Sequence, residues 1–210
     1  MAIDISKVFE NNEEWIKEKL DEDPSFFDNL SRGQQPEFLF LGCSDSRISV
    51  DNLLKADMGE VFVHRNIANI APNNDFNFIT VINYALTHLE VKHVIVCGHY
   101  HCGGINAAME HKDLGFLNPW LRNIRDIYRL HSEELDAIQN VVQRNNRLVE
   151  INVVEQCVNI AKTVDFQKAY KTREVYLHGW VFDLKTGKLI DMKIDTDLIM
   201  NKIERIYRMD

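Results

Sequence analysis

Two short motifs in the sequence contain residue types that bind transition metals. The first is CSDSR, Cys43 to Arg47, and the second is HYHC, His99 to Cys102. Two thiolates and one imidazole suit Zn²⁺, which takes sulfur and nitrogen ligands in tetrahedral geometry. Three protein ligands would leave a fourth coordination position, which either water or the nearby carboxylate of Asp45 could fill.

The chemistry of such a site depends on its fourth ligand. The pKa of a zinc-bound water falls from about 15.7 to about 7, so the water becomes a hydroxide nucleophile near neutral pH. Two thiolates neutralise the dication and weaken this effect, so nearby positive charge should help, and Arg47 is the candidate. A helix that starts at Gly103 and Gly104 should favour the thiolate of Cys102.

Asp45 allows two arrangements, and the sequence leaves both open. It could bind the metal as a fourth ligand, which would close the site to a nucleophile. It could instead pair with Arg47 and accept a hydrogen bond from zinc-bound hydroxide, which would aim a lone pair at the substrate. We expect higher pH to favour the second arrangement. A closed structural zinc site and an ordinary surface salt bridge are the simpler alternatives.

The elements that carry these motifs predict an α/β fold. Apolar runs that predict buried strands alternate with helical patterns such as NDFNFITVINYALTHLE; the runs are PEFLFLGC, EVFVHRN and KHVIVCG. This alternation indicates a mostly parallel central sheet flanked by helices, and a final hairpin, REVYLHGWVFDL with GKLIDMKID, should add an antiparallel edge strand. Ligands bind at the carboxyl ends of such strands. The three metal-binding side chains should therefore converge if their strands are neighbours.

The composition limits the class of protein. The chain has 210 residues, 45% hydrophobic and 27% charged, as expected for a single globular domain over residues 1–210. A net charge of −8 argues against nucleic acid or an anionic membrane as a partner. No secretory signal is evident and four cysteines do not suggest a disulfide framework, so we expect a cytoplasmic protein in which Cys97 and Cys157 are buried thiols.

The paired motifs CSDSR and HYHCGG resemble those of the β-class carbonic anhydrase family. The similarity continues through VFVHRNIAN, INYALTHLEVKHVIVCGH and LHGWVFDLKTGKL. The resemblance implies reversible hydration of CO₂ to bicarbonate and a proton by zinc-bound hydroxide. It also implies one Zn²⁺ per subunit on Cys43, His99 and Cys102, with Asp45 and Arg47 as a catalytic dyad.

The resemblance further implies a homodimer or homotetramer, with a helical N-terminal arm, about residues 1–35, packed on a partner subunit. Gln34 matches a glutamine that lines the substrate pocket of the family. Members inhibited by a second bicarbonate typically have tryptophan and tyrosine where this chain has Phe40 and Phe182. Arg65 matches the arginine of that pocket, but phenylalanine offers no hydrogen-bond donor. We therefore expect the inhibitory site to be weak or absent.

Two other functions would use the same residues. A relative with the same fold could hydrolyse a sulfur analogue of CO₂, such as COS or CS₂. A non-catalytic, zinc-stabilised interaction module would need the three metal ligands but neither Gln34 nor the Asp45–Arg47 pair. A thiol redox protein is disfavoured because HYHC is not a C-x-x-C motif.

Overall fold

The protein is described by a computed structural model that covers residues 4–208. The chain divides into two compact units, of which one ends at Gln35 and the other begins at Pro36. The first unit is helical; its elements are η1 (Ile5–Lys7), α1 (Val8–Glu22) and α2 (Phe26–Ser31). Helix α1 ends before Asp23, whose backbone is extended, as expected for a residue before proline. The packing of this unit on a partner subunit stays a prediction.

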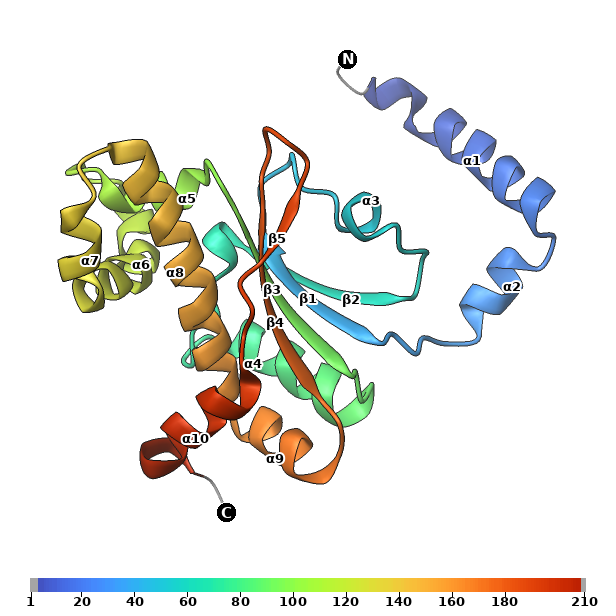
Figure 1. Ribbon diagram of the computed structural model, residues 1–210. Helices are drawn as coiled ribbons and strands as arrows, with labels where there is room; N and C mark the ends of the chain where they lie inside the picture. Colours follow the sequence, from blue (N-terminus) through green and yellow to red (C-terminus); the bar gives the residue numbers. More distant parts are fainter. Residues whose placement is uncertain (1–3, 209–210) are drawn as a thin grey trace. The chain divides into compact units, whose positions relative to one another are not determined.

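The larger unit is built on a five-stranded sheet with the order β2-β1-β3-β4-β5 (Figure 1). Its strands are β1 (Phe38–Cys43), β2 (Val61–Asn66), β3 (His93–His99), β4 (Tyr176–Phe182) and β5 (Leu189–Asp191). The first four strands pair in parallel, and β5 pairs antiparallel with β4. This confirms the predicted mostly parallel sheet with an antiparallel edge strand.

Burial explains the sequence patterns of the strands. Strands β1 and β3 are buried at all but their first residue, because side chains on both of their faces are covered. One face of β1 and β3 contributes to the main core, through Leu39, Leu41, Val94 and Val96. The other face forms a smaller cluster around Phe40. Strand β4 alternates between buried and partly exposed residues, so only one of its faces is fully covered.

Helices connect the strands and cover the sheet (Figure 1). They are α3 (Val50–Leu54), α4 (Phe76–Asn83), α5 (Gly103–Met109), α6 (Asn118–Leu130), α7 (Ser132–Ala137), α8 (Val141–Ala161), α9 (Val164–Thr172) and α10 (Thr196–Tyr207). Short 3-10 turns occur at η2 (Ile67–Asn69) and η4 (Gly115–Leu117). In the part of the chain that the structure describes, no helix is long and apolar enough to cross a membrane.

The helix predicted over NDFNFITVINYALTHLE is not uniform. Helix α4 passes into a π-helical turn, η3 (Tyr84–His88), whose end is marked by a hydrogen bond from the amide of Leu89 to the carbonyl of Tyr84. The guanidinium of Arg173 donates to the carbonyls of Leu86 and Val91 at 2.9 and 2.8 Å. The first bond satisfies a carbonyl within the π-helical turn, and the second holds the chain just after it.

The strand order places a topological switch point between β1 and β3. The chain leaves β1 to form β2 on one side of it and then crosses to form β3 on the other side. Ligands of open α/β sheets bind at the carboxyl ends of the strands at such a point. Strand β1 ends at Cys43 and β3 ends at His99, and the two strands are neighbours, so the condition for the expected convergence is met.

Glycine at position 98 allows helix α8 to pack closely on β3. A Cβ atom at Gly98 would lie 2.7 Å from Cγ2 of Val153 and 3.3 Å from Cγ1 of Val149, both on α8. These separations are shorter than a carbon–carbon contact, so a side chain could enter only if the helix or the valines shifted.

We expect Gly98→Ala to lower the free energy of unfolding by about 1–3 kcal/mol, because the valines of α8 must move. Urea unfolding followed by circular dichroism measures this change. The matched control is Gly103→Ala, since a Cβ atom at Gly103 meets no atom within 4 Å. Equal unfolding midpoints for the two variants would contradict the close packing of α8 on β3.

Candidate metal centre

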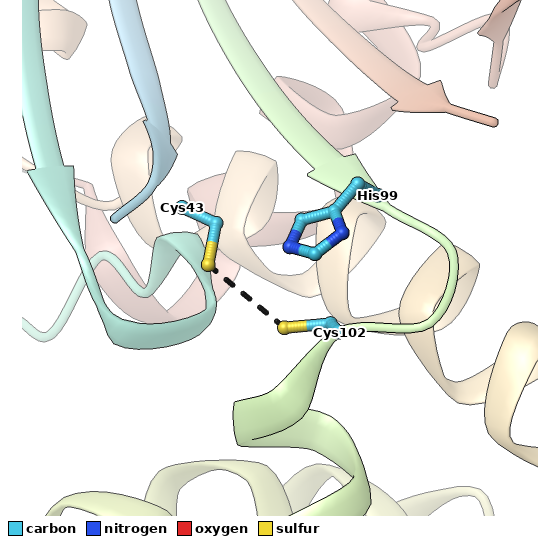
Figure 2. Close-up of side chains that lie close together, drawn as sticks. All are labelled: Cys43, His99 and Cys102. Atoms are coloured by element: carbon cyan, nitrogen blue, oxygen red, sulfur yellow. Dashed lines mark hydrogen bonds between the residues drawn. The ribbon is translucent and has the colours of Figure 1, made fainter. Parts of the chain in front are cut away.

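Cys43, His99 and Cys102 lie together at the carboxyl ends of β1 and β3 (Figure 2). Their candidate ligand atoms all lie within 4.8 Å of one another, and all three side chains are buried. Cys43 ends β1, His99 ends β3, and Cys102 is the residue before α5. The three side chains therefore converge, as expected for neighbouring strands.

The imidazole of His99 has a nitrogen suited to a metal ion. Its Nδ1 lies 3.0 Å from the backbone carbonyl of Tyr100, so this nitrogen carries the proton and donates. Its Nε2 then has a free lone pair. Among the buried side-chain nitrogens and oxygens of the described residues, only this atom and Nδ2 of Asn69 have no hydrogen-bond partner. A buried, unpaired acceptor is costly in a protein interior, and a bound cation would satisfy it.

The two sulfur atoms have the spacing that a zinc ion requires. The Sγ atoms of Cys43 and Cys102 are 3.9 Å apart (Figure 2). A tetrahedral Zn²⁺ with Zn–S bonds of about 2.3 Å places two sulfur ligands about 3.8 Å apart. Two sulfurs and one imidazole nitrogen are also a donor set that Zn²⁺ prefers. The residues therefore fit a zinc ion by geometry and by chemistry.

The environment of Cys43 favours a thiolate. The pKa of this thiol is lowered because Cys102 donates a hydrogen bond to it, with smaller contributions from His99 and from the backbone amides of Ala68 and Asp45. Burial opposes this effect. A thiolate is the form of cysteine that binds metals.

The pKa of the Cys102 thiol is shifted in the opposite direction to that of Cys43. Its pKa is raised because it shares its proton with Cys43 and because it is buried, while the amides of Ile105 and Gly104 at the start of α5 oppose the rise. Helix α5 can start close to the site because Gly104 has no side chain: a Cβ atom there would lie 2.8 Å from Cγ2 of Ile67. A dication between the sulfurs would replace the shared proton and favour both thiolates.

Two buried polar residues of α8 hold the loop that follows β2, and the sequence did not reveal them. Nδ2 of Asn152 donates to the carbonyl of Ala68 at 3.1 Å, and Nε2 of Gln156 donates to Oδ1 of Asn152 at 2.9 Å. Oε1 of Gln156 accepts from the amide of Ala71 at 2.7 Å. The loop is unusual because Ala68 and Asn69 have positive φ angles of 64° and 48°. These bonds position the amide of Ala68 near Cys43.

Asp45 and Arg47 form a two-pronged ion pair beside the metal-binding group. Nε of Arg47 lies 2.8 Å from Oδ1 of Asp45, Nη2 lies 2.6 Å from Oδ2, and the amide of Arg47 also donates to Oδ1 at 3.0 Å. These bonds hold the pKa of the Asp45 carboxyl well below its usual range. Oδ2 also lies 3.7 Å from Nε2 of His99. Asp45 thus pairs with Arg47, and its possible role as a fourth metal ligand stays a prediction.

Arg65 is occupied by the backbone of the first motif. Its Nε and Nη2 donate to the carbonyl of Cys43 at 2.9 and 2.7 Å, and Nη2 also donates to the carbonyl of Asp45 at 2.9 Å. Phe40 is fully buried, and Phe182 packs against the same small cluster. Neither phenyl ring can donate a hydrogen bond. Of Phe40, Phe182 and Arg65, the three residues that match the inhibitory pocket of the family, only Arg65 has donors.

The other residues considered from the sequence lie outside the metal-binding group. Cys97 and Cys157 are buried, as predicted, and burial raises the pKa of both thiols, that of Cys97 to about 12. Gln34 is an exposed residue of the N-terminal unit. Its place in a substrate pocket therefore stays a prediction.

Comparison with known proteins identifies the family. A family model described as carbonic anhydrase matches residues 38–189, which extend from β1 into β5. A carbonic anhydrase of Emericella nidulans is 53% identical over 204 residues, which cover 97% of this chain and 90% of the relative. A carbonic anhydrase of Candida albicans is 38% identical and aligns over 81% of this chain and 61% of its own length.

Solved structures agree with these relatives. A β-carbonic anhydrase of Aspergillus fumigatus superimposes with a TM-score of 0.91 at 34% identity and covers 98% of this chain and 99% of its own. A tetrameric β-carbonic anhydrase of Sordaria macrospora gives a TM-score of 0.86 at 36% identity and covers 90% of this chain and 96% of its own. With the motifs, the sheet and these matches in agreement, the chain belongs to the β-class carbonic anhydrase family.

Proposed function

We propose that the protein catalyses the reversible hydration of CO₂ to bicarbonate and a proton, with one Zn²⁺ held by Cys43, His99 and Cys102. The observation that carries this proposal is the buried, unpartnered Nε2 of His99 next to two sulfur atoms 3.9 Å apart. When bound, Zn²⁺ lowers the pKa of a coordinated water to about 7 and so supplies hydroxide for attack on CO₂ near neutral pH.

Asp45 and Arg47 are proposed to orient the nucleophile. Because Arg47 keeps Asp45 ionised, this carboxylate can only accept hydrogen bonds. An acceptor at this position would hold the proton of the nucleophile and leave a lone pair directed at carbon. Arg47 also restrains Asp45 from becoming a fourth metal ligand, since its two hydrogen bonds to the carboxylate would have to break first.

Substrate binding and assembly are proposed from the family. Gln34 would bind the substrate through its amide, and the chain would form a homodimer or homotetramer. The related β-carbonic anhydrases of Sordaria macrospora are tetrameric. Helix α1 has no buried residue; its Phe9 is 82% exposed, and Ile5 in the preceding turn η1 is 83% exposed. Exposed apolar side chains of this kind support the proposal that the N-terminal arm packs on a partner subunit. The cytoplasmic location also stays a prediction.

The reaction is tested by stopped-flow CO₂ hydration on protein of known zinc content. We expect Asp45→Asn to lower kcat/KM by roughly a hundredfold with zinc retained, the scale of losing a group that handles a proton in the transition state. Because the pKa of Asp45 lies below its usual range, protonation of Asp45 should not shape the pH profile of the wild type near neutrality.

Asp51→Asn is the matched control, because Asp51 is an exposed residue of α3. Full activity of Asp45→Asn would contradict the proposed role of Asp45. Zinc-loaded wild type that fails to hydrate CO₂ at neutral and alkaline pH would overturn the reaction itself. Turnover of COS or CS₂ by the same sample would then identify the sulfur analogue as substrate.

The metal ligands are tested by zinc content after dialysis against a chelator. We expect about one zinc per chain in the wild type and little in Cys43→Ser, His99→Ala or Cys102→Ser, because each change removes one of three protein ligands. Cys97→Ser and Cys157→Ser are controls for loss of a buried thiol and should keep the metal. Atomic emission spectroscopy gives the stoichiometry, and an unchanged value for Cys43→Ser would refute this ligand set.

We expect bicarbonate to inhibit CO₂ hydration without cooperativity. Phe40 and Phe182 supply no donors to a second bicarbonate, and each missing hydrogen bond to a charged group weakens binding by roughly tenfold or more. Initial rates measured against bicarbonate concentration, with chloride at equal ionic strength as the control, give the inhibition curve. A steep, sigmoidal curve would show that an inhibitory site is present.

A further inference from the structure

A cavity lies outside the candidate metal centre. It has a volume of about 590 Å³ and opens between the end of α5, helix α6 and the first turn of α8. Figure 1 shows these three helices gathered on one side of the sheet. The polar side chains that line the cavity are Glu110, His111, Lys112, Arg125, Tyr128 and Arg144. A cavity of this size can hold a small molecule.

The charge of this cavity is opposite to that of the whole chain. The net charge of the protein is −8, yet three cationic side chains line the cavity against one carboxylate, that of Glu110. Glu110 lies 3.6 Å from Nζ of Lys112, and both side chains are exposed. An exposed pair of this kind contributes little. The charges of Glu110 and Lys112 cancel, so the guanidinium groups of Arg125 and Arg144 give the cavity its positive potential.

The two arginines are fixed by backbone bonds rather than by carboxylates. Nε of Arg125 donates to the carbonyl of Ala108 at 3.0 Å, and Nε of Arg144 donates to the carbonyl of Ile138 at 2.9 Å. Neither arginine forms an ion pair within residues 4–208. Arg144 also interacts with the hydroxyl of Tyr128, which itself donates to Asp136. Both guanidinium groups are thus held in place at the cavity by uncharged partners, and the nearest carboxylate linked to Arg144 is that of Asp136, on the other side of the Tyr128 hydroxyl.

Helix capping explains only part of this arrangement. Ala108 lies in the last turn of α5 and Ile138 directly follows α7, so each Nε satisfies a carbonyl at a helix end. A cap of this kind uses one N–H group of the guanidinium. It does not require that the two arginines line one cavity, or that a lysine and a histidine join them there.

We propose that this cavity binds a multivalent oxyanion, either free phosphate or the phosphate group of a small molecule. The planar N–H pairs of Arg125 and Arg144 suit phosphate oxygens, and their fixed positions reduce the entropy lost on binding. Lys112 adds a mobile charge at the rim. This site lies outside the metal-binding group and does not depend on the proposed reaction.

The proposal is tested by isothermal titration of zinc-loaded protein with inorganic phosphate and with pyrophosphate at fixed ionic strength. We expect saturable binding that Arg125→Gln and Arg144→Gln each weaken by roughly tenfold or more, since each loses hydrogen bonds to a charged group. Arg122→Gln is the matched control: Arg122 is an exposed arginine of α6 and does not line the cavity. An anion bound at the metal centre would respond to none of the three changes.

Lys112→Gln tests the site without disturbing a helix end, because the Lys112 ammonium contacts only Glu110 in the described residues. We expect a smaller loss of affinity, with the circular dichroism spectrum and CO₂ hydration unchanged. Equal affinity in the wild type and the Arg125→Gln and Lys112→Gln variants would overturn the proposal, as would the lack of saturable binding by the wild type. A change of oligomeric state in Arg125→Gln, together with no binding by the wild type, would instead identify an interface between copies of the chain.

Discussion

The parallel pairing of β1 with β3 is the constraint on which the metal centre depends. Cys43 is the last residue of β1, and His99 is the last residue of β3. Cys102 lies in the turn that follows β3. If the two strands were not neighbours, no local rearrangement could bring the sulfur and nitrogen atoms within 4.8 Å of one another. The two sequence motifs therefore form one site because they lie at the switch point of the sheet.

Hydrogen bonds from side chains to backbone carbonyls shape this edge of the sheet. Arg65 binds the carbonyls of Cys43 and Asp45, and Asn152 binds the carbonyl of Ala68. The backbone amides of Ala68 and Asp45 donate to the sulfur of Cys43 and lower the pKa of its thiol. The same kind of bond occurs at the cavity beside α6, where Arg125 and Arg144 each donate to a carbonyl at a helix end. In both places, side chains from distant segments fix the ends of secondary structure elements.

Much of this fold could be predicted from the sequence, because its signals are local. Continuous apolar runs predicted the central strands, and the final hairpin was predicted from two strand patterns; the segment between its strands contains Gly187, whose φ is 70°. The π-helical turn after α4 could not be predicted, since a carbonyl within it, that of Leu86, accepts a hydrogen bond from Arg173, which is far away in the sequence. Asn152 and Gln156 were also missed. Polar residues four positions apart on a helix usually face solvent, and only the packed structure shows that these two are 1% and 0% exposed.

The arrangement of Asp45 lay beyond sequence reasoning for a different reason. The Asp45 carboxylate lies close both to Arg47 and to the candidate metal ligand His99, so its partner depends on side-chain angles. Motifs specify which groups are present near a site. They do not specify the distances of less than 4 Å that separate a ligand from a counterion.

The buried Asn152–Gln156 pair has a consequence for how the enzyme matures. Because this pair and Arg65 hold the loops around Cys43 through hydrogen bonds of the chain itself, the cradle for the ion is built by protein contacts. Small zinc domains differ, since they fold only as they take up their metal. If Zn²⁺ binds here as proposed, it would enter loops that are already held by the chain itself, so zinc supply would set how much of the enzyme is active rather than how much of it folds.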